Sequence, residues 1–286
     1  MLSYQHAYHA GNFADVHKHL TLHAAIDHLL RKESSITYID THAGRGLYPL
    51  DATETTRLRE YRDGVLPLWK SRQTLTDRVT NEPLLNDWLA ALASAQPDSS
   101  HLTYYPGSPW WMGHRLRKGD RQWLYELHPG EHELLAQQPF QEAVERIHGD
   151  GLKGLLQRLP VKTPRLCVLI DPSYERKTEY LEVAQTLLSA MRKARHAMVL
   201  VWYPLLPAGR HRELLEVLRD GGLRKIWFGE FIRQSPGEGE RGMYGSGMLV
   251  VNPPWGFDER LAAAMAPVID LLGASGAYRS GWWVGE

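Results

Sequence analysis

The sequence predicts a Rossmann-like α/β fold with a seven-stranded, doubly wound sheet, and two observations support this prediction. Apolar runs rich in β-branched and aromatic residues recur along the chain, and amphipathic segments separate several of them. An acidic residue ends or closely follows each of the first four runs, at the place where open α/β sheets bind ligands. The expected strands are, in order, Ile36–Asp40, Trp123–Glu126, Val144–His148, Arg165–Ile170, Met198–Trp202, Lys225–Phe231 and Gly247–Val251.

The first expected strand ends in Asp40 and leads into a glycine-containing turn, residues 41–46. Glycine lets a backbone approach a ligand closely, and the N–H groups of such a loop can bind a carboxylate. Because a single Gly-x-Gly turn is common, an ordinary turn remains an alternative.

The second and third expected strands end in candidate cofactor ligands. Glu126 can accept both hydroxyls of a ribose, as acids do in dinucleotide sites. Asp150 can accept from the amine of an adenine, and Gly151 leaves room for its ring. Taken alone, each acid is more typical of a turn or a helix cap. Four such strand ends in succession, without a Gly-x-Gly-x-x-Gly sequence, favour S-adenosylmethionine over a nicotinamide cofactor.

The fourth expected strand leads directly into Asp171-Pro172-Ser173-Tyr174, the segment that points most directly to a reaction. The Asp171 carboxylate and the Pro172 carbonyl can each accept one N–H of an NH2 group. Two such acceptors favour a pyramidal nitrogen, whose lone pair can attack an electrophilic methyl group. Tyr174 can stack on a base swung out of its helix. The segment therefore predicts methylation of an exocyclic amine, although Asp-Pro also begins ordinary turns.

A similar segment, Asn252-Pro253-Pro254-Trp255, follows the seventh expected strand and fits the small polar–Pro–Pro–aromatic pattern of amino-methyltransferases more closely. In a doubly wound sheet the first and fourth strands lie side by side, with the binding crevice above them. The seventh strand would lie near the far edge. We therefore expect Asn252 to form a structural strand-to-helix turn with Trp255 packed, and Asp171 to act in catalysis.

Length and composition are typical of a cytoplasmic enzyme. The chain has 286 residues, 43% of them hydrophobic, and no net charge, which argues against bulk electrostatic attraction to nucleic acid. It has no secretory signal and no apolar run that could span a bilayer, and its single Cys167 lies inside the fourth strand. About eighty residues separate the first two strands, more than a crossover helix needs. We place a small helical insertion there, at residues 51–100.

Histidines are concentrated near the N-terminus, where a polar helix face is the simplest interpretation. His19 and His23 have a spacing that can bind a metal. No Glu lies between them in the zincin pattern, and the chain has one cysteine, so we predict no metal site. The histidines of this segment are His6, His9, His17, His19, His23 and His28.

Segments spread along the whole chain resemble one bacterial family. They are residues 1–12, 14–19, 40–46, 105–109, 126–129, 202–204 and 247–255. With the segment after the fourth strand, they are similar to the 23S ribosomal RNA adenine-N6 methyltransferases called J. The family motif is Asp-Pro-Pro-Tyr, and its third position here is Ser173. Asp171, Pro172 and Tyr174 keep the expected contacts, so we expect activity, with a slightly looser loop.

The resemblance implies a class I S-adenosylmethionine-dependent methyltransferase that acts on the N6 amine of a flipped adenine in 23S ribosomal RNA. Residues 1–50 and 101–286 would form the methyltransferase domain, and residues 1–28 a flexible tail and a helix that close over the cofactor. Tyr4 would meet the substrate, with His6 and Lys18 near the active site. The positions implied to contact the cofactor are His19, His42, Ser108, Glu126, Asp150, Gly151 and Asp171.

Two other functions remain open from the sequence. A DNA adenine-N6 methyltransferase would share the catalytic segment, but it usually carries a larger target-recognition domain than this insertion. A non-catalytic nucleic-acid adaptor on the same fold would be expected to lose its cofactor acids, and all four strand ends retain them. We expect 23S ribosomal RNA as the partner, no membrane contact, no obligate protein partner, and a monomer.

Overall fold

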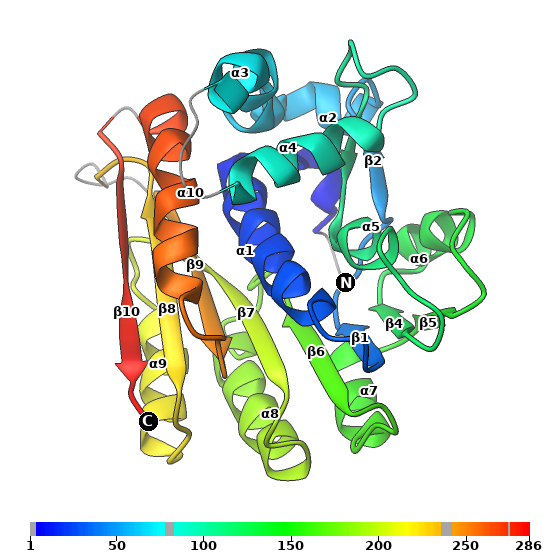
Figure 1. The fold of residues 1–286 in the computed structure, drawn as a ribbon. Helices are drawn as coiled ribbons and strands as arrows, with labels where there is room; N and C mark the ends of the chain where they lie inside the picture. The colour runs from blue at the N-terminus through cyan, green and yellow to red at the C-terminus, as the bar shows by residue number, and fades with distance from the viewer. Residues whose placement is uncertain (1–3, 78–82, 236–241, 274) are drawn as a thin grey trace.

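A mixed sheet of eight strands, in the order β10-β8-β9-β7-β6-β1-β4-β5, forms the centre of the molecule (Figure 1). The computed structural model describes residues 4–77, 83–235, 242–273 and 275–286. The strands are β1 (Ile36–Asp40), β4 (Arg121–Glu126), β5 (Val144–His148), β6 (Arg165–Ile170), β7 (Met198–Leu205), β8 (Ile226–Ile232), β9 (Gly245–Val251) and β10 (Ala277–Val284).

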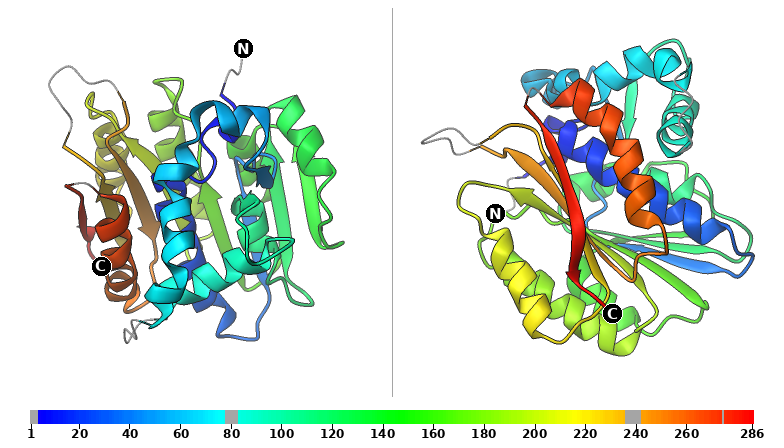
Figure 2. Two further views of the ribbon diagram at one scale, coloured as in Figure 1. Left: turned by 90° about the horizontal axis from the view of Figure 1, so that it is seen from above. Right: turned by 60° about the vertical axis from the view of Figure 1, so that its left-hand side comes forward.

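Helices cover both faces of this sheet (Figure 2). One face carries α1 (Phe13–Leu30), α3 (Val65–Asp77), α4 (Leu84–Ser94), α5 (Ser108–Gly113) and α10 (Phe257–Leu272); the other carries α7 (Gly151–Arg158), α8 (Glu179–Lys193) and α9 (His211–Asp220). Successive side chains of β6 alternate between two hydrophobic cores, one on each face of the sheet. Cys167 and Leu169 pack toward α1, whereas Val168 and Ile170 pack toward α8, because successive side chains of a strand point to opposite faces.

The sheet places the ends of the first strands together. β1 pairs in parallel with β6 on one side and with β4 on the other. β5 is parallel to β4, and β7 is parallel to β6. The carboxyl ends of these strands therefore meet at one edge of the sheet, with β1 and β6 adjacent as expected.

Strand β10 was absent from the expectation of seven strands. It pairs antiparallel with β8 at the edge of the sheet, and its residues are partly or fully exposed. An edge strand buries little surface, so its sequence carries only a weak alternating pattern.

Asn252 and Asp171 lie at opposite ends of the strands of the sheet. The direction of β9 is the deciding reason. Strand β9 lies between β7 and β8, third from one edge of the sheet and separated from β6 by β7. Because β9 is antiparallel to β7, its carboxyl end points away from the binding edge. The Asn252 side-chain amide donates to the carbonyls of Arg195 (2.9 Å) and Ala197 (2.8 Å), which is a structural role. Trp255 is 97% exposed, so the expectation that it packs is wrong.

Helix α1 is buried along most of its length, which corrects the interpretation of its histidines as a polar face. His17, His19 and His23 are almost completely enclosed. The helix is covered on all sides because it packs on β9 and is flanked by α10, α4 and α5. Its histidines are therefore parts of the interior.

The segment between β1 and β4 carries helices and two short strands that pair with each other. The helices are α2 (Thr53–Leu58), the 3-10 helix η2 (Glu60–Asp63), α3, α4 and α5, and the strands β2 (Leu47–Pro49) and β3 (Tyr104–Pro106) pair antiparallel. Trp69 and Trp88 of this segment join the hydrophobic core that α1 forms. The segment thus packs onto the core that α1 forms; its boundaries at 51 and 100 stay a prediction. No helix within the described ranges is long and apolar enough to cross a membrane.

Candidate active site

A cavity of about 1040 Å³ opens at the carboxyl ends of β1, β4, β5 and β6. The loops after these strands form one wall, and the N-terminal segment and α1 form another. All the residues that the sequence analysis assigned to catalysis, cofactor contact or substrate contact through the family resemblance or the segment after the fourth strand line this cavity. These residues are Tyr4, His6, Lys18, His19, His42, Ser108, Glu126, Asp150, Gly151, Asp171, Pro172 and Tyr174.

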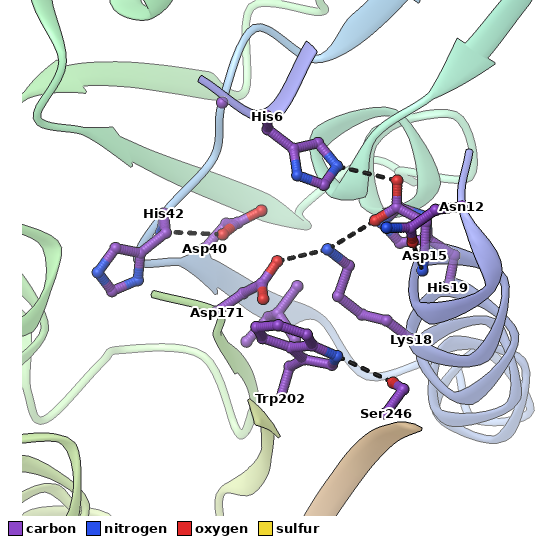
Figure 3. Close-up of polar contacts among 12 residues, drawn as sticks. His6, Asn12, Asp15, Lys18, His19, Asp40, His42, Asp171, Trp202 and Ser246 are labelled. Atoms are coloured by element: carbon purple, nitrogen blue, oxygen red, sulfur yellow. Dashed lines mark hydrogen bonds and ion pairs between the residues drawn. The ribbon is translucent and has the colours of Figure 1, made fainter. Parts of the chain in front are cut away.

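Asp171, directly after β6, forms an ion pair with Lys18 of α1 (Figure 3). The Lys18 ammonium lies 2.6 Å from Asp171 Oδ2 and 2.9 Å from Asp15 Oδ1. Asp15 also accepts from the backbone N–H of Gly11 and contacts His6 Nε2, each at 2.9 Å. A chain of charged groups thus runs from the N-terminal segment to the end of β6.

Burial and ion pairing act in opposite directions on these groups. Burial raises the pKa of Asp171, and Lys18 offsets part of that rise. Burial acts to lower the pKa of Lys18, but Asp15 and Asp171 outweigh it and leave that pKa raised. Burial likewise acts to raise the pKa of Asp15, but His6 and Lys18 hold it well below its usual range. Lys18 is therefore a cation at neutral pH and favours the ionised form of both carboxylates.

Asp40 ends β1 beside this ion pair and is fully buried. Its Oδ1 accepts from the His42 backbone N–H at 3.2 Å, and its Oδ2 has no hydrogen-bond partner. Burial raises the pKa of Asp40 to about 7, against the lowering effects of the nearby Ser108 and of the His42 N–H. Burial also lowers the pKa of His42 to about 4, so His42 is neutral at physiological pH.

Glu126, at the end of β4, is fixed by two backbone groups. Its Oε2 accepts from the N–H of Gly44 and its Oε1 from the N–H of His128, each at 2.7 Å. Each carboxylate oxygen has a second lone pair, and the side chain lines the cavity. Burial raises the pKa of Glu126. The glycine turn after β1 therefore orients this acid.

Asp150 and Gly151 begin α7. Asp150 is the N-cap of the helix and accepts from the N–H groups of Leu152 and Lys153 at 3.1 Å. A Cβ at Gly151 would lie 2.0 Å from the backbone oxygen of Thr41. Packing of α7 against the end of β1 therefore requires glycine here, a reason that the sequence interpretation missed.

Tyr174 is held in a left-handed backbone conformation, with φ 54°, which is uncommon for a residue other than glycine. Its hydroxyl donates to the Trp202 carbonyl at 2.8 Å, and its ring stacks on Tyr180 with the centroids 4.3 Å apart. One face of Tyr174 is thus already covered. Its role in stacking on a substrate base stays a prediction.

The N-terminal segment is fixed at two places over the cavity. The backbone N–H of Tyr4 donates to Glu175 Oε2 at 3.3 Å, next to the loop after β6. The Tyr4 hydroxyl lies 2.9 Å from His6 Nδ1, and its ring stacks on His9. Glu60 of η2 in turn contacts His9 Nδ1 at 3.0 Å. The inserted helices therefore support the segment that covers the cavity.

Two residues of the cavity wall were missed as individual site residues. Asp15 contacts Lys18, and the i,i+3 spacing of an acid and a lysine on one helix could have indicated this pair. Trp202 lies in the part of β7 nearest Asp171. The centroid of its ring lies 5.8 Å from the Lys18 ammonium, and its indole N–H donates to the Ser246 hydroxyl. Nothing in the local pattern of β7 indicated that its indole lines the cavity.

His19 and His23 do not form a pair for a metal. His19 Nδ1 lies 2.7 Å from the Tyr105 hydroxyl, and His23 packs edge-on against Trp111. Among the described residues, no group of three or more His, Cys, Asp or Glu side chains could hold a metal ion.

A family model and several known proteins match nearly the whole chain. The model described as "Ribosomal RNA large subunit methyltransferase D, RlmJ" matches residues 33–284. The chain is 34% identical over 262 residues to the ribosomal RNA large subunit methyltransferase J of Escherichia coli, covering 91% of this chain and 90% of that protein. It is 32% identical over 287 residues to the protein of the same name from Haemophilus influenzae, covering 100% and 98%.

A solved structure has the same fold. The crystal structure of a protein from Legionella pneumophila is 33% identical and matches with a TM-score of 0.86, over 96% of this chain and 98% of that one. The fold shared with that protein therefore extends over nearly the whole length of both chains. The chain belongs to the J family of ribosomal RNA large subunit methyltransferases.

Proposed function

We propose that this protein transfers a methyl group from S-adenosylmethionine to the N6 amine of an adenine in 23S ribosomal RNA. The observation that carries the proposal is the position of Asp171. Its carboxylate lies directly after β6 in a cavity that also receives Glu126 and Asp150 from the neighbouring strand ends. The cavity is therefore lined by one acceptor for a target amine and by several acids for a cationic cofactor.

The residues of the cavity fit S-adenosylmethionine. Glu126 is oriented by two backbone N–H groups and has acceptor capacity left for ribose hydroxyls. Asp40 has a buried oxygen without a partner, and Ser108 lies beside it. His19, His42, Asp150 and Gly151 would complete the contacts. When bound, the cofactor supplies an electrophilic methyl group on a positively charged sulfur, which these carboxylates would stabilise.

The chain's own residues would bind and orient the target base. Asp171 would accept one N–H of the amine at its Oδ1, because Lys18 already pairs with Oδ2. The Pro172 carbonyl would accept the other N–H. Tyr174 and Tyr4 would contact the ring of the flipped adenine, and the segment bearing Tyr4 and His6 would exclude water. We place Lys18 beside Asp171 and not at a phosphate, because two carboxylates surround its ammonium.

The inserted helices support the choice of RNA over DNA. Helices α3 and α4 pack on α10, α4 also packs on α1, and Glu60 of η2 holds the N-terminal segment through His9. We propose that this insertion is a subdomain that positions the tail, whereas a DNA enzyme would need a larger recognition domain. We further propose that the protein acts as a monomer, which light scattering on the purified protein would test.

The direct test is transfer of labelled methyl by the purified protein. In vitro transcribed 23S ribosomal RNA, duplex DNA of adenine-rich sequence and RNA without adenine would be compared at one salt concentration. We expect label in 23S ribosomal RNA only, recovered as N6-methyladenosine after nuclease digestion. Label in DNA, or cofactor binding with no transfer to any nucleic acid, would support one of the two alternatives and reject this proposal.

A further inference from the structure

We infer that Asp15 is a positioning residue that acts through Lys18, by holding its ammonium against Asp171. The inference rests on the proposed function, since it concerns the residue that would bind the target amine. Asp15 is 1% exposed and lies in the first turn of α1. It lies three residues before Lys18, on the same side of the helix.

The backbone around Asp15 fixes its carboxylate. The Asn12 side chain caps α1 by accepting from the Asp15 N–H at 2.9 Å. The Gly11 N–H donates to Asp15 Oδ2, and His6 Nε2 lies 2.9 Å from the same oxygen. Asp15 Oδ1 is left for Lys18. Both oxygens are thus used by the chain itself, so Asp15 supports the site and need not touch the substrate.

Lys18 needs such support because of its length. A lysine side chain has four rotatable bonds and a compact charge with no preferred direction of hydrogen bonding. Here its ammonium has a carboxylate on each side, and the Trp202 ring lies 5.8 Å away. Together these groups leave Lys18 little freedom of position within the cavity wall.

The position of Lys18 determines what Asp171 offers to a substrate. The ammonium occupies Oδ2, which leaves Oδ1 for the target amine. Burial alone favours the protonated form of Asp171, and a protonated carboxyl could turn its O–H toward the amine. By fixing the cation against Oδ2, Asp15 leaves Asp171 with Oδ1 as the one free oxygen for the substrate.

The substitution Asp15→Asn tests this at constant shape. Its amide oxygen can still accept from the Gly11 N–H, but the charge beside Lys18 is lost. Asp27→Asn is the matched control. Asp27 lies on the same helix and pairs with Arg31, Arg115 and Arg260, and it is outside the cavity lining.

The first readout does not depend on catalysis. In the wild-type protein we expect the buried Lys18 ammonium to give a solvent-protected ¹H–¹⁵N signal by NMR, assigned by its absence in Lys18→Met. Asp15→Asn should broaden or remove this signal, and Asp27→Asn should leave it unchanged. An unaltered Lys18 signal in Asp15→Asn would overturn the inference, whether or not the protein methylates RNA.

The second readout is a double-mutant cycle on single-turnover methyl transfer. We expect Asp15→Asn to slow transfer about tenfold or more, while cofactor affinity stays close to wild type and the protein remains folded at the assay temperature. In a Lys18→Met background the same substitution should cause no further loss, because its effect passes through Lys18. Two results would assign Asp15 a merely structural role. In one, the rate losses of the two single variants multiply in the double variant. In the other, the melting temperature of Asp15→Asn falls so far that unfolding at the assay temperature explains its lower rate. Failure of wild-type transfer would reject the proposed function and leave the NMR result to decide this inference.

Discussion

The Lys18 ammonium lies 2.6 Å from the Asp171 carboxylate, across 153 positions of sequence. This contact ties the helix that precedes the sheet to the loop after β6. It also sets the electrostatics of the site, because Lys18 opposes the rise in the Asp171 pKa that burial causes.

Substitution Asp171→Ala should abolish most methyl transfer while the protein stays folded. It removes the acceptor for the target amine, and loss of one such group from a preorganised site costs about 10²- to 10³-fold in rate. Single-turnover transfer to 23S ribosomal RNA, with circular dichroism on the same sample, measures both effects.

Substitution Asn252→Ala is the control for the competing proline-rich segment. It removes the hydrogen bonds to the carbonyls of Arg195 and Ala197, so stability should fall by about 1–3 kcal/mol. The transfer rate of the folded protein should not change, because the antiparallel β9 places Asn252 at the other edge of the sheet. A folded but inactive Asn252 variant, together with an active Asp171→Ala, would reverse the assignment.

Substitution Glu126→Gln should weaken S-adenosylmethionine binding. A charged contact to ribose hydroxyls contributes about 1.5–3 kcal/mol, so calorimetry should detect a roughly ten- to hundredfold loss of affinity. The new amide would also face one of the N–H donors of Gly44 and His128, which adds to the loss. Glu133→Gln, on the exposed face of α6 (Pro129–Ala136), serves as the control. Equal affinity in both variants would remove Glu126 from the cofactor site.

Two variants of Tyr4 should distinguish the contribution of its ring to the transfer rate from that of its hydroxyl. Tyr4→Phe loses only the contact with His6 and should slow transfer by a factor of about two to ten. Tyr4→Ala also loses stacking on the base, about 1–3 kcal/mol, and should slow transfer further. Cofactor affinity should stay near wild type in both. Tyr8→Ala, in the same segment but outside the cavity lining, is the control. Parallel losses in melting temperature, cofactor affinity and rate would indicate that the segment only covers the sheet.

Asp40 should make stability depend on pH. Burial raises its pKa from 3.8 to about 7 in the folded protein, so the folded state binds this proton more tightly than the unfolded chain. The stabilisation is full below about pH 4 and is lost as pH rises toward 7, by up to about 1.4 kcal/mol per pH unit. Asp40→Asn cannot titrate. As the pH rises from 5 to 8, the melting temperature of the wild type should therefore fall relative to that of Asp40→Asn. A constant difference across that range would show that Asp40 is ionised throughout.

The sequence alone determined most of the strands and the chemistry at their ends. Buried parallel strands such as Arg165–Ile170 are short apolar runs. Glu126 ends such a run, and Asp150 and Asp171 closely follow one. Both signals lie within a few neighbouring residues, so no tertiary information is needed to find them. The family resemblance added Tyr4, His6 and Lys18, for which the local chemistry gave no reason.

Only the tertiary structure decided which groups meet. The direction of β9 excluded Asn252 from the binding edge, and a strand's direction depends on its partners and not on its own sequence. The histidines of α1 lie in the interior because neighbouring helices cover this helix from several sides. Lys18 reaches Asp171, and Asp15 holds Lys18, through packing that joins distant parts of the chain. Local sequence specifies which residues can act, whereas long-range packing fixes the few ångströms that let them act together.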